Sequence, residues 1–450
     1  MKKLGLKIYI VLFLIVCMVP ALGMFVQGKV EPVGNEILQA APKLTKGGKF
    51  NTDVLVNISD YISDHFALRR PLASLWAGLN AKLLGTSVEE QVMLGQDGWL
   101  FYTDTAEDCI GLGMDDGLIG YAANNLAMVQ EYLEAEGVEF SFVIAPNKGS
   151  LYPQMLPDYA KGQRDGANAP RLIAALESAG VSTADLFSAF ENEEILYYQT
   201  DSHWNSKGAA LAADKILESL GRDSGFYAGS FIAGEEHRGD LYEMLYPSGS
   251  YTEQDIIPAE LFSFTAVNDT AKGNAINFST ENSAAQGSLF CWRDSFGISL
   301  YPYLAESFGA AQFSRSFPYE LPKAVEQGAD SVVIELVERN LDQLLSTAAV
   351  FPAPLRDIAA QQQVQGSIKL SEGKEKSGLK NYYGSLSGVP MDEGSRVYAQ
   401  CEGRVFEAMV TAETELGFSL WLPVESSAPA ALLCYDNGIL CSYELLLEDK

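Results

Sequence analysis

Residues 288–307 read SLFCWRDSFGISLYPYLAES, an apolar strand that runs through a short polar turn into a helix. A buried strand joined directly to a helix is the repeating unit of an α/β protein. Two other stretches fit the same unit: residues 121–144, where a helix precedes an apolar strand, and residues 331–337, which read SVVIELV. Together these units predict an α/β fold with a mostly parallel sheet flanked by helices.

The predicted α/β domain covers residues 46–350. Within it, residues 222–285 are rich in Gly, Ser and Asn and have no strong periodicity, so we expect an insertion or a lid there. The sequence FPAP at 351–354 and the glutamines at 361–363 predict a linker. Short alternating apolar segments separated by Gly and Ser follow, and they predict a small, antiparallel β-rich domain over residues 365–450.

The N-terminus has the layout of an export signal. Lys2, Lys3 and Lys7 precede a run at 8–26 without a charged residue. A basic start followed by an apolar stretch of this length predicts either a signal peptide or a membrane anchor over residues 1–26. We therefore expect an extracytoplasmic protein, secreted or tethered to the cell membrane.

Charge and cysteine content narrow the classes of function. The formal net charge of -28 excludes a nucleic-acid binder, because phosphate recognition needs clustered Lys and Arg. The six cysteines have neither zinc-site spacing nor the density of a disulfide framework, although Cys434 and Cys441 are close enough in sequence to bridge. The sequence predicts no metal site and no cofactor.

Histidine is scarce, and this limits the choice of a general base. The chain has three: His65, His203 and His237. We interpret His65 as a packing or surface residue of an amphipathic segment, and His237, within EEHR, as part of a solvated charged stretch. His203 differs because Asp201 precedes it by two residues, a spacing at which the carboxylate can hold the ring. The alternative is that Asp201 caps the helix predicted at 206–220.

Ser295 is the candidate nucleophile. It follows the strand at 288–292 and precedes a helix, so it lies at the carboxyl edge of the predicted sheet, where such folds bind ligands. An ordinary N-cap serine is the alternative. Backbone amides near Phe296 at the start of this helix are candidates for an oxyanion site. Asn147 and Lys148 follow another strand and are further oxyanion or substrate candidates, as is Arg293.

Four passages together resemble the SGNH hydrolase-like acyltransferase family that includes the alginate O-acetyltransferases, and more closely its DHHW relatives. They are DHFALR at 64–69, LGQDGWLF at 94–101, DSHW at 201–204 and DSFG at 294–297. The resemblance implies that Asp201, His203 and Ser295 form a catalytic triad. Two positions depart from the pattern: Ser202 replaces the first His of the name-giving motif, and Arg293 replaces the Gly that precedes Asp-Ser.

The resemblance implies transfer of acetyl groups to hydroxyls of an extracellular polysaccharide, through an acyl-Ser intermediate. It also implies a membrane acyl-exporting O-acyltransferase partner that supplies the acyl group. Two other functions stay open from the sequence: a carbohydrate acetylesterase with the same triad, and a non-catalytic scaffold that binds polysaccharide. A purely structural envelope protein is a weaker third.

Overall fold

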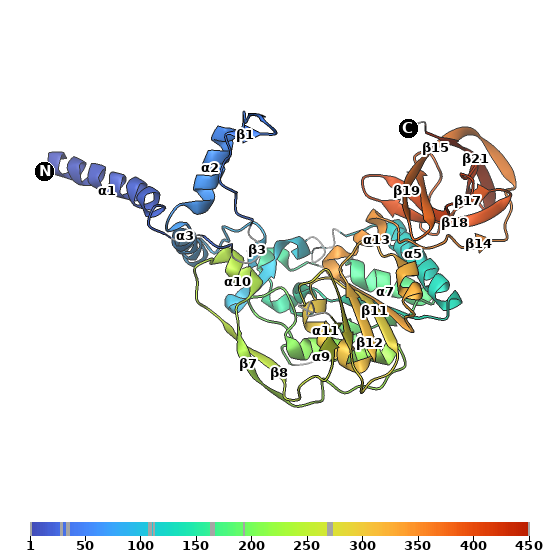
Figure 1. Ribbon diagram of the computed structural model, residues 1–450, viewed down its shortest axis with the longest axis horizontal. Coiled ribbons are helices and arrows are strands. Elements are labelled where there is room, and N and C mark those ends of the chain that lie inside the picture. Colours follow the sequence, from blue (N-terminus) through green and yellow to red (C-terminus); the bar gives the residue numbers. More distant parts are fainter. Residues whose placement is uncertain are drawn as a thin grey trace.

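The computed structural model describes residues 2–27, 30–32, 37–106, 110, 113–162, 167–191, 194–267 and 273–448. Figure 1 shows a central α/β body, a β-barrel at the C-terminal end of the chain, and helices that project from the body at the N-terminal end.

The α/β body is built on a seven-stranded sheet of the described residues, in the order β6-β5-β13-β11-β12-β10-β9. The strands are β5 (Glu139–Ala145), β6 (Thr183–Ala184), β9 (Thr265–Ala266), β10 (Asn277–Glu281), β11 (Ser288–Trp292), β12 (Ala310–Ser314) and β13 (Ser331–Val337). The pairings from β6 through β12 are parallel, whereas β10 and β9 join antiparallel. The predicted α/β fold with a mostly parallel sheet is confirmed.

Helices cover both faces of this sheet, because its strands are apolar on both sides. On β5, Phe140 and Phe142 pack with one layer, and Val143 and Ala145 pack with the other. The first layer holds α5 (Asp116–Ala135), α7 (Asn168–Ser178), α12 (Leu321–Glu326) and α13 (Gln343–Ser346). The second layer holds α6 (Lys148–Leu151), α8 (Leu186–Phe190), α9 (Ser206–Ser219) and α11 (Gly297–Ser307).

The C-terminal strands form a closed barrel, because β18 pairs with both β17 and β19. The strands are β14 (Leu355–Arg356), β15 (Gln362–Lys376), β16 (Leu379–Ser385), β17 (Val397–Cys401), β18 (Arg404–Ala412), β19 (Leu416–Pro423), β20 (Ala431–Asp436) and β21 (Ile439–Leu447). Two details differ from expectation. Gln362 and Gln363 are not a linker but pair with β21, and this β15–β21 pairing is parallel.

The barrel shares a core with the α/β body. The buried side chain of Asn125 on α5 donates to the carbonyl of Val410 on β18 (2.8 Å) and accepts from its N–H (3.2 Å). Cys434 and Cys441 are directly opposed on β20 and β21 but are free thiols, so the bridge considered from the sequence is absent from this pair.

The N-terminal arm contains α1 (Lys2–Gly23), the β1–β2 hairpin (Thr45–Lys46 and Lys49–Phe50), α2 (Val54–His65) and α3 (Arg69–Leu84). In the described part of the chain, none of the helices meets the length and apolarity needed to traverse a bilayer. The signal peptide or anchor at 1–26 stays a prediction. Next comes a hairpin of β3 (Val92–Leu94) and β4 (Leu100–Tyr102), joined by a 3₁₀ turn at Gln96–Gly98.

Residues 222–285, expected as an insertion or lid, contain β9, β10 and a second hairpin, β7 (Phe231–His237) and β8 (Glu253–Pro258), with α10 (Asp240–Leu245) between its strands. The hairpin holds the loop that carries Asp201. Glu253 accepts hydrogen bonds from the backbone N–H groups of Gln199 (2.6 Å) and Thr200 (2.7 Å). This contact makes the segment a support of the site.

Candidate active site

Two chain segments deliver the predicted triad to one place. Asp201 and His203 lie in the loop before α9, and Ser295 lies in the turn between β11 and α11. Asn205 precedes α9 and caps it, because its side-chain oxygen accepts from the N–H of Gly208 (2.9 Å). Because Asn205 is the cap, the alternative capping role considered for Asp201 is wrong.

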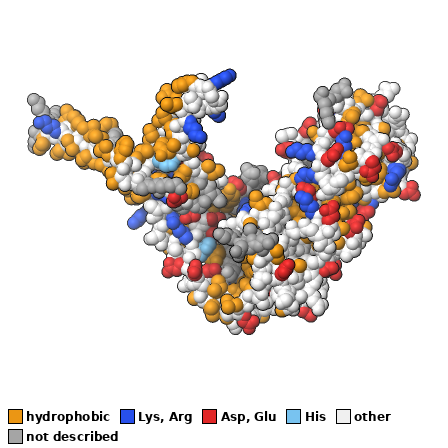
Figure 2. Space-filling view, viewed as in Figure 1, with side chains coloured by type: hydrophobic (Ala, Val, Ile, Leu, Met, Phe, Trp, Pro, Cys, Tyr) orange, Lys and Arg blue, Asp and Glu red, His pale blue; other side chains and the backbone are white. Residues whose placement is uncertain are grey.

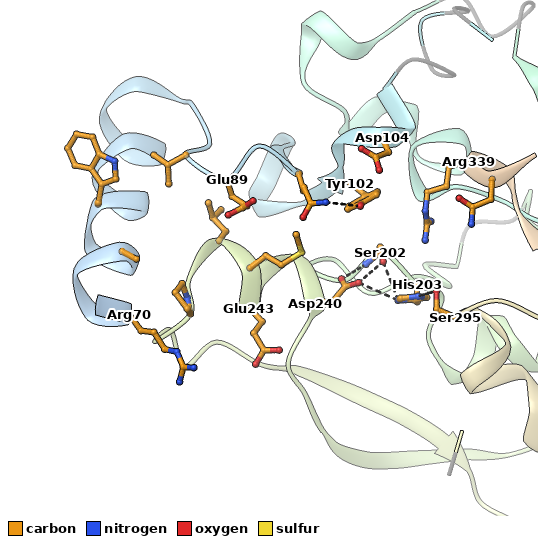
Figure 3. A pocket seen from close by; sticks show the side chains of 18 of the residues that line it. Arg70, Glu89, Tyr102, Asp104, Ser202, His203, Asp240, Glu243, Ser295 and Arg339 are labelled. Atoms are coloured by element: carbon orange, nitrogen blue, oxygen red, sulfur yellow. Dashed lines mark hydrogen bonds and ion pairs between the residues drawn. The ribbon is translucent and has the colours of Figure 1, made fainter. Parts of the chain in front are cut away.

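The three side chains form a continuous hydrogen-bonded line (Figure 3 shows its Ser295–His203 end). His203 Nε2 lies 2.9 Å from Ser295 Oγ, and His203 Nδ1 lies 2.7 Å from Asp201 Oδ1. Both distances fall within the range expected between a nucleophile, its base and the group that orients the base.

The carboxylate of Asp201 is buried and receives four hydrogen bonds. Its Oδ1 accepts from the backbone N–H (2.9 Å) and ring Nδ1 of His203, and its Oδ2 accepts from His237 Nε2 (2.9 Å) and the N–H of Asp240 (2.9 Å). Burial raises the pKa of Asp201, but hydrogen bonds from both histidines outweigh this effect and hold the pKa well below its ordinary value. Asp201 is therefore ionised.

His237 is a residue that sequence reasoning misplaced. Its ring stacks on Tyr198 at 3.9 Å and bonds Asp201, so the interpretation of EEHR as a solvated stretch is wrong for this residue. Nothing in the local sequence indicates this contact, because it depends on how the β7–β8 hairpin folds back over the Asp201 loop.

The base is also placed by packing. Burial lowers the pKa of His203, but the hydrogen bond and charge of Asp201 raise it, and the net shift is upward. The ring of Phe296 lies 4.8 Å from that of His203. Trp204 is fully buried behind Phe296, with ring centroids 4.9 Å apart. Trp204 therefore acts on the base through Phe296.

A second carboxylate lies beside the base. Asp240 accepts from the hydroxyl (2.6 Å) and the N–H (2.8 Å) of Ser202, and it lies 3.6 Å from His203 Nδ1. Burial, followed by the charge of Asp201, raises the pKa of Asp240. Ser202 stands where the DHHW motif has its first His, and it links Asp240 to the loop that carries His203.

The turn around Ser295 is shaped by Asp294. One carboxylate oxygen accepts from the N–H of Phe296 (2.8 Å) and the other from the N–H of Val337 (2.8 Å). The N–H of Asp294 donates to Glu335 Oε2 (3.1 Å), and burial together with the charge of Asp294 raises the pKa of Glu335 well above its ordinary value. Since the N–H of Phe296 is occupied by Asp294, it does not face the pocket as an oxyanion donor, contrary to expectation.

The other predicted donors are directed elsewhere. Lys148 is buried, and its ammonium donates to the carbonyls of Tyr198 (3.1 Å), Gln199 (3.0 Å) and Asp201 (2.5 Å). Burial lowers the pKa of Lys148 to about 8. All three ammonium protons are used, so Lys148 supports the Asp201 loop and does not bind substrate.

Arg293 and Asn147 are likewise buried. Arg293 donates to the carbonyls of Asp294 (2.9 Å) and Gly273 (2.5 Å), so its side chain ties the turn to a neighbouring loop and is absent from the pocket lining. Asn147 donates its N–H to Glu338 (2.7 Å), while its side-chain amide has no hydrogen-bond partner among the described residues. Neither residue lines the cavity next to Ser295.

That cavity has a volume of about 910 Å³ and extends from Ser295 and His203 to α3 (Figure 3). Charged residues from several elements line it: Arg69, Arg70, Glu89, Asp104, Asp240, Glu243, Arg315 and Arg339. The side chain of Arg339 points toward His203 and Ser295, and its guanidinium lies 5.4 Å from the ring of Tyr102 and 5.6 Å from that of Phe296. Sequence reasoning missed Arg339, although it follows β13 at the edge that carries the site.

Asp201, His203 and Asp240 bring one ligand atom each to within 4.8 Å of one another, a spacing that can accommodate a metal ion. These atoms are engaged in the hydrogen bonds described above. The expectation of no metal stays a prediction.

Comparison with known proteins agrees with this architecture. Residues 92–276 match the family model described as SGNH hydrolase-like domain, acetyltransferase AlgX. Over these residues the chain is similar to SGNH hydrolase-like domains. The resemblance predicted from the four motifs is thereby confirmed, and the matched range includes Asp201 and His203 but ends before Ser295.

The chain is also similar to a probable alginate O-acetylase AlgJ of Pseudomonas syringae pv. tomato, with 30% identity over 162 residues, which cover 35% of this chain and 40% of that protein. The chain spans about two fifths of the length of the curated relatives it matches. Among solved structures, Bacillus cereus PatB1 with a sulfonyl adduct is 18% identical with a TM-score of 0.45, covering 56% of this chain and 97% of that one. A DHHW family protein from Eubacterium siraeum is 18% identical with a TM-score of 0.40, covering 54% and 89%.

Proposed function

We propose that this chain is an extracytoplasmic serine O-acetyltransferase that acts on hydroxyls of a cell-surface or exported polysaccharide. The observation that carries the proposal is the line from Ser295 Oγ to His203 Nε2 (2.9 Å) and from His203 Nδ1 to Asp201 (2.7 Å). It supports Ser295 as nucleophile, His203 as general base and Asp201 as the group that orients and charge-stabilises the imidazole. Similarity to probable alginate O-acetylases favours a polysaccharide acceptor.

In the first half-reaction, Ser295 Oγ attacks the carbonyl carbon of an acyl donor while His203 Nε2 takes the hydroxyl proton. The bond between the acyl carbon and the donor's leaving group then breaks, and the imidazolium returns its proton to that group. The ionised Asp201 stabilises the imidazolium in between. The product is an ester of Ser295.

In the second half-reaction, a sugar hydroxyl occupies the position of the leaving group. His203 takes its proton, the sugar oxygen attacks the ester carbon, and Ser295 Oγ leaves and recovers the proton. The cavity of about 910 Å³ next to Ser295 offers room for more than one sugar unit.

Arg339 is our candidate for stabilising the oxyanion of both tetrahedral intermediates. Its guanidinium points toward Ser295 and His203 from the pocket wall (Figure 3), whereas the N–H of Phe296 is occupied by Asp294. A fixed cation next to the reacting carbonyl stabilises the negative charge that develops on its oxygen. On this assignment, Arg339→Gln lowers kcat for acetyl release by roughly a hundredfold or more. Ser295 should still react with a serine-directed phosphonate in this variant, because the nucleophile and its base are unchanged.

The proposal includes the setting of the reaction. The basic, apolar N-terminus supports export, as a cleaved signal or as an anchor formed by residues 1–26. A membrane acyl-exporting O-acyltransferase is the proposed donor partner, because an extracytoplasmic enzyme needs its acyl group delivered from the cell.

A carbohydrate acetylesterase is the second candidate, because water can replace the sugar hydroxyl in the same site. The broad cavity, with many charged lining residues, is the observation that favours it. The distinction depends on how well a bound acceptor excludes water from the ester.

The test compares wild type with Ser295→Ala and His203→Ala in acetyl release from p-nitrophenyl acetate, with and without oligosaccharide acceptors. Ser307→Ala, at the far end of the same helix α11, is the matched control. Activity lost in the first two variants and kept in the control supports the triad, and acetylated oligosaccharide in the products selects the transferase. A serine-directed phosphonate that labels wild type and Ser295→Ala equally, together with equal acetyl release, would refute the proposal and favour a non-catalytic scaffold.

A further inference from the structure

The helix α3 has its apolar side chains on the outside. Its inner face packs through Ala77 against the β3–β4 hairpin and α10, and Asn80 is also buried. The outer face carries an apolar stripe at a spacing of three and four residues. The stripe consists of Leu72 (45% exposed), Leu75 (60%), Trp76 (60%), Leu79 (45%) and Leu83 (73%).

The neighbouring helix α2 shows the same pattern. Leu55, Ile58 and Ile62 repeat along one side and are exposed. Figure 2 shows apolar side chains gathered over α2 and the adjoining part of the arm, in contrast to the mixed surface of the barrel. Exposed apolar stripes of this kind, unlike scattered single leucines, mark an interaction site. We call the exposed stripes of α2 and α3 the apolar face.

Charge indicates what this face meets. Residues 1–85 contain ten Lys or Arg and five Asp or Glu, a net charge of +5 in a chain whose total is -28. The remaining residues therefore carry -33. This excess lies in residues 1–49, whereas residues 50–85 carry three charges of each sign, and the three basic ones all lie on α3. On α3, Arg69, Arg70 and Lys82 accompany the stripe, and this helix has no acidic residue. Amphipathic helices with leucine, an exposed tryptophan and basic residues bind anionic bilayer surfaces. The strongly acidic remainder is repelled by such a surface, so electrostatics would also orient the protein.

We propose that the apolar face docks flat on a lipid bilayer with anionic headgroups, with α3 lying in the interface. The inference stands on the stripe and on the charge asymmetry, independently of any activity. One consequence rests on the proposed function: Arg69, Arg70 and Trp76 also line the cavity that leads to Ser295, so docking places one wall of the active-site cavity at headgroup level. An acyl group delivered at the membrane would enter from that side.

The chain offers a built-in reporter. Of its five tryptophans, Trp76 is exposed, whereas Trp99, Trp204, Trp292 and Trp421 are buried. Lipids with brominated acyl chains quench tryptophan emission at the depth of the bromine. Quenching in the full-length protein therefore reports the immersion of α3 whether or not residues 1–26 also enter the bilayer.

The experiment adds full-length protein to vesicles of phosphatidylglycerol and phosphatidylcholine with shallow-brominated chains. We expect quenching in wild type that disappears in Trp76→Phe, is weaker on pure phosphatidylcholine, and is unchanged in Ser295→Ala. Leu75→Ser with Leu79→Ser should weaken vesicle binding, followed as quenching against lipid concentration, about tenfold or more, because two exposed leucines that the bilayer would bury are lost. The matched control is Leu446→Ser with Leu447→Ser on the barrel, where both leucines are about equally exposed.

Vesicle flotation of wild type without quenching of Trp76 would overturn the proposal, and it would assign the apolar face to a protein partner. Quenching that persists in Trp76→Phe would overturn it as well, because the signal would then come from the interior tryptophans. Unchanged quenching in Ser295→Ala keeps this result separate from the proposed enzymatic activity.

Discussion

Replacing Asp201 by asparagine tests the role of its carboxylate in the triad, because the substitution keeps the shape of the side chain and removes its charge. Four donors converge on the two carboxylate oxygens, two on each. An amide offers one oxygen, and its NH₂ group must face one of the two donor pairs. Keeping the oxygen toward His203 leaves the NH₂ group against His237 Nε2 and the N–H of Asp240.

The consequences differ for these two donors. His237 can change tautomer and accept from the new NH₂ group, whereas the N–H of Asp240 cannot and is left unpaired. One unsatisfied buried donor costs about 1–3 kcal/mol of stability. Loss of the negative charge removes the stabilisation of the imidazolium, so we expect kcat for acetyl release to fall by roughly 10³–10⁴.

Stability should follow pH with a defined sign. The folded-state pKa of Asp201 lies well below the unfolded value of 3.8, so its contribution is fully present above pH 3.8 and is lost as pH falls through the folded-state pKa. The gap in unfolding free energy between wild type and Asp201→Asn should therefore narrow below about pH 4.

The assays are p-nitrophenyl acetate turnover and urea denaturation at several pH values. Asp104→Asn, a carboxylate on the opposite wall of the cavity, is the matched control. Turnover by Asp201→Asn within tenfold of wild type would refute the assigned role of the carboxylate, and a gap in stability that widens in acid would refute the assignment of its pKa.

Three further outcomes follow from the same geometry. Because the pKa of His203 is raised, kcat/KM should rise with pH with a midpoint above 6.5, and a pH profile with its midpoint at or below 6.5 contradicts this. His237→Ala should lower kcat about tenfold, whereas His237→Gln should keep most of the wild-type kcat, because its amide can still donate to Asp201. Equal losses of kcat in the two variants, measured by steady-state kinetics, would argue against a role through that hydrogen bond. Lys148→Met leaves three carbonyls of the Asp201 loop without their donor and should destabilise the fold by about 2–5 kcal/mol in denaturant titrations, and a change under 1 kcal/mol would contradict the role of the ammonium.

Much of the site could be predicted because its members sit at strongly patterned positions. The apolar strand before Ser295 and the helix after it place the serine at the carboxyl edge of a parallel sheet whatever the rest of the chain does. The two-residue spacing of Asp201 and His203 makes their contact local. The sequence does not show that the loop of His203 and the turn of Ser295 meet. The tertiary structure brings them together, with His203 Nε2 2.9 Å from Ser295 Oγ.

The wrong predictions share one feature: each polar group finds its partner within the protein. The predictions for Phe296, Lys148 and Arg293 rest on the idea that polar groups after a strand face a ligand. In the structure, the N–H of Phe296 donates to a carboxylate, and the side chains of Lys148 and Arg293 donate to backbone carbonyls. His237 was assigned to solvent because its sequence neighbours are charged. For Lys148, Arg293 and His237 the partner is distant in sequence and has no local signature. For Phe296 the partner is Asp294, two residues earlier, so this contact is a local turn.

The sequence by itself determined the fold class, the order of the elements and the residue types able to do acyl chemistry, because period, apolar runs and short spacings act over a few residues. Only the tertiary structure decided that Asp201 is shared by two histidines and that Arg339 faces the nucleophile. It also decided that α3 presents its leucines outward. These properties depend on which surfaces pack together, and packing is settled by contacts between segments tens to hundreds of residues apart.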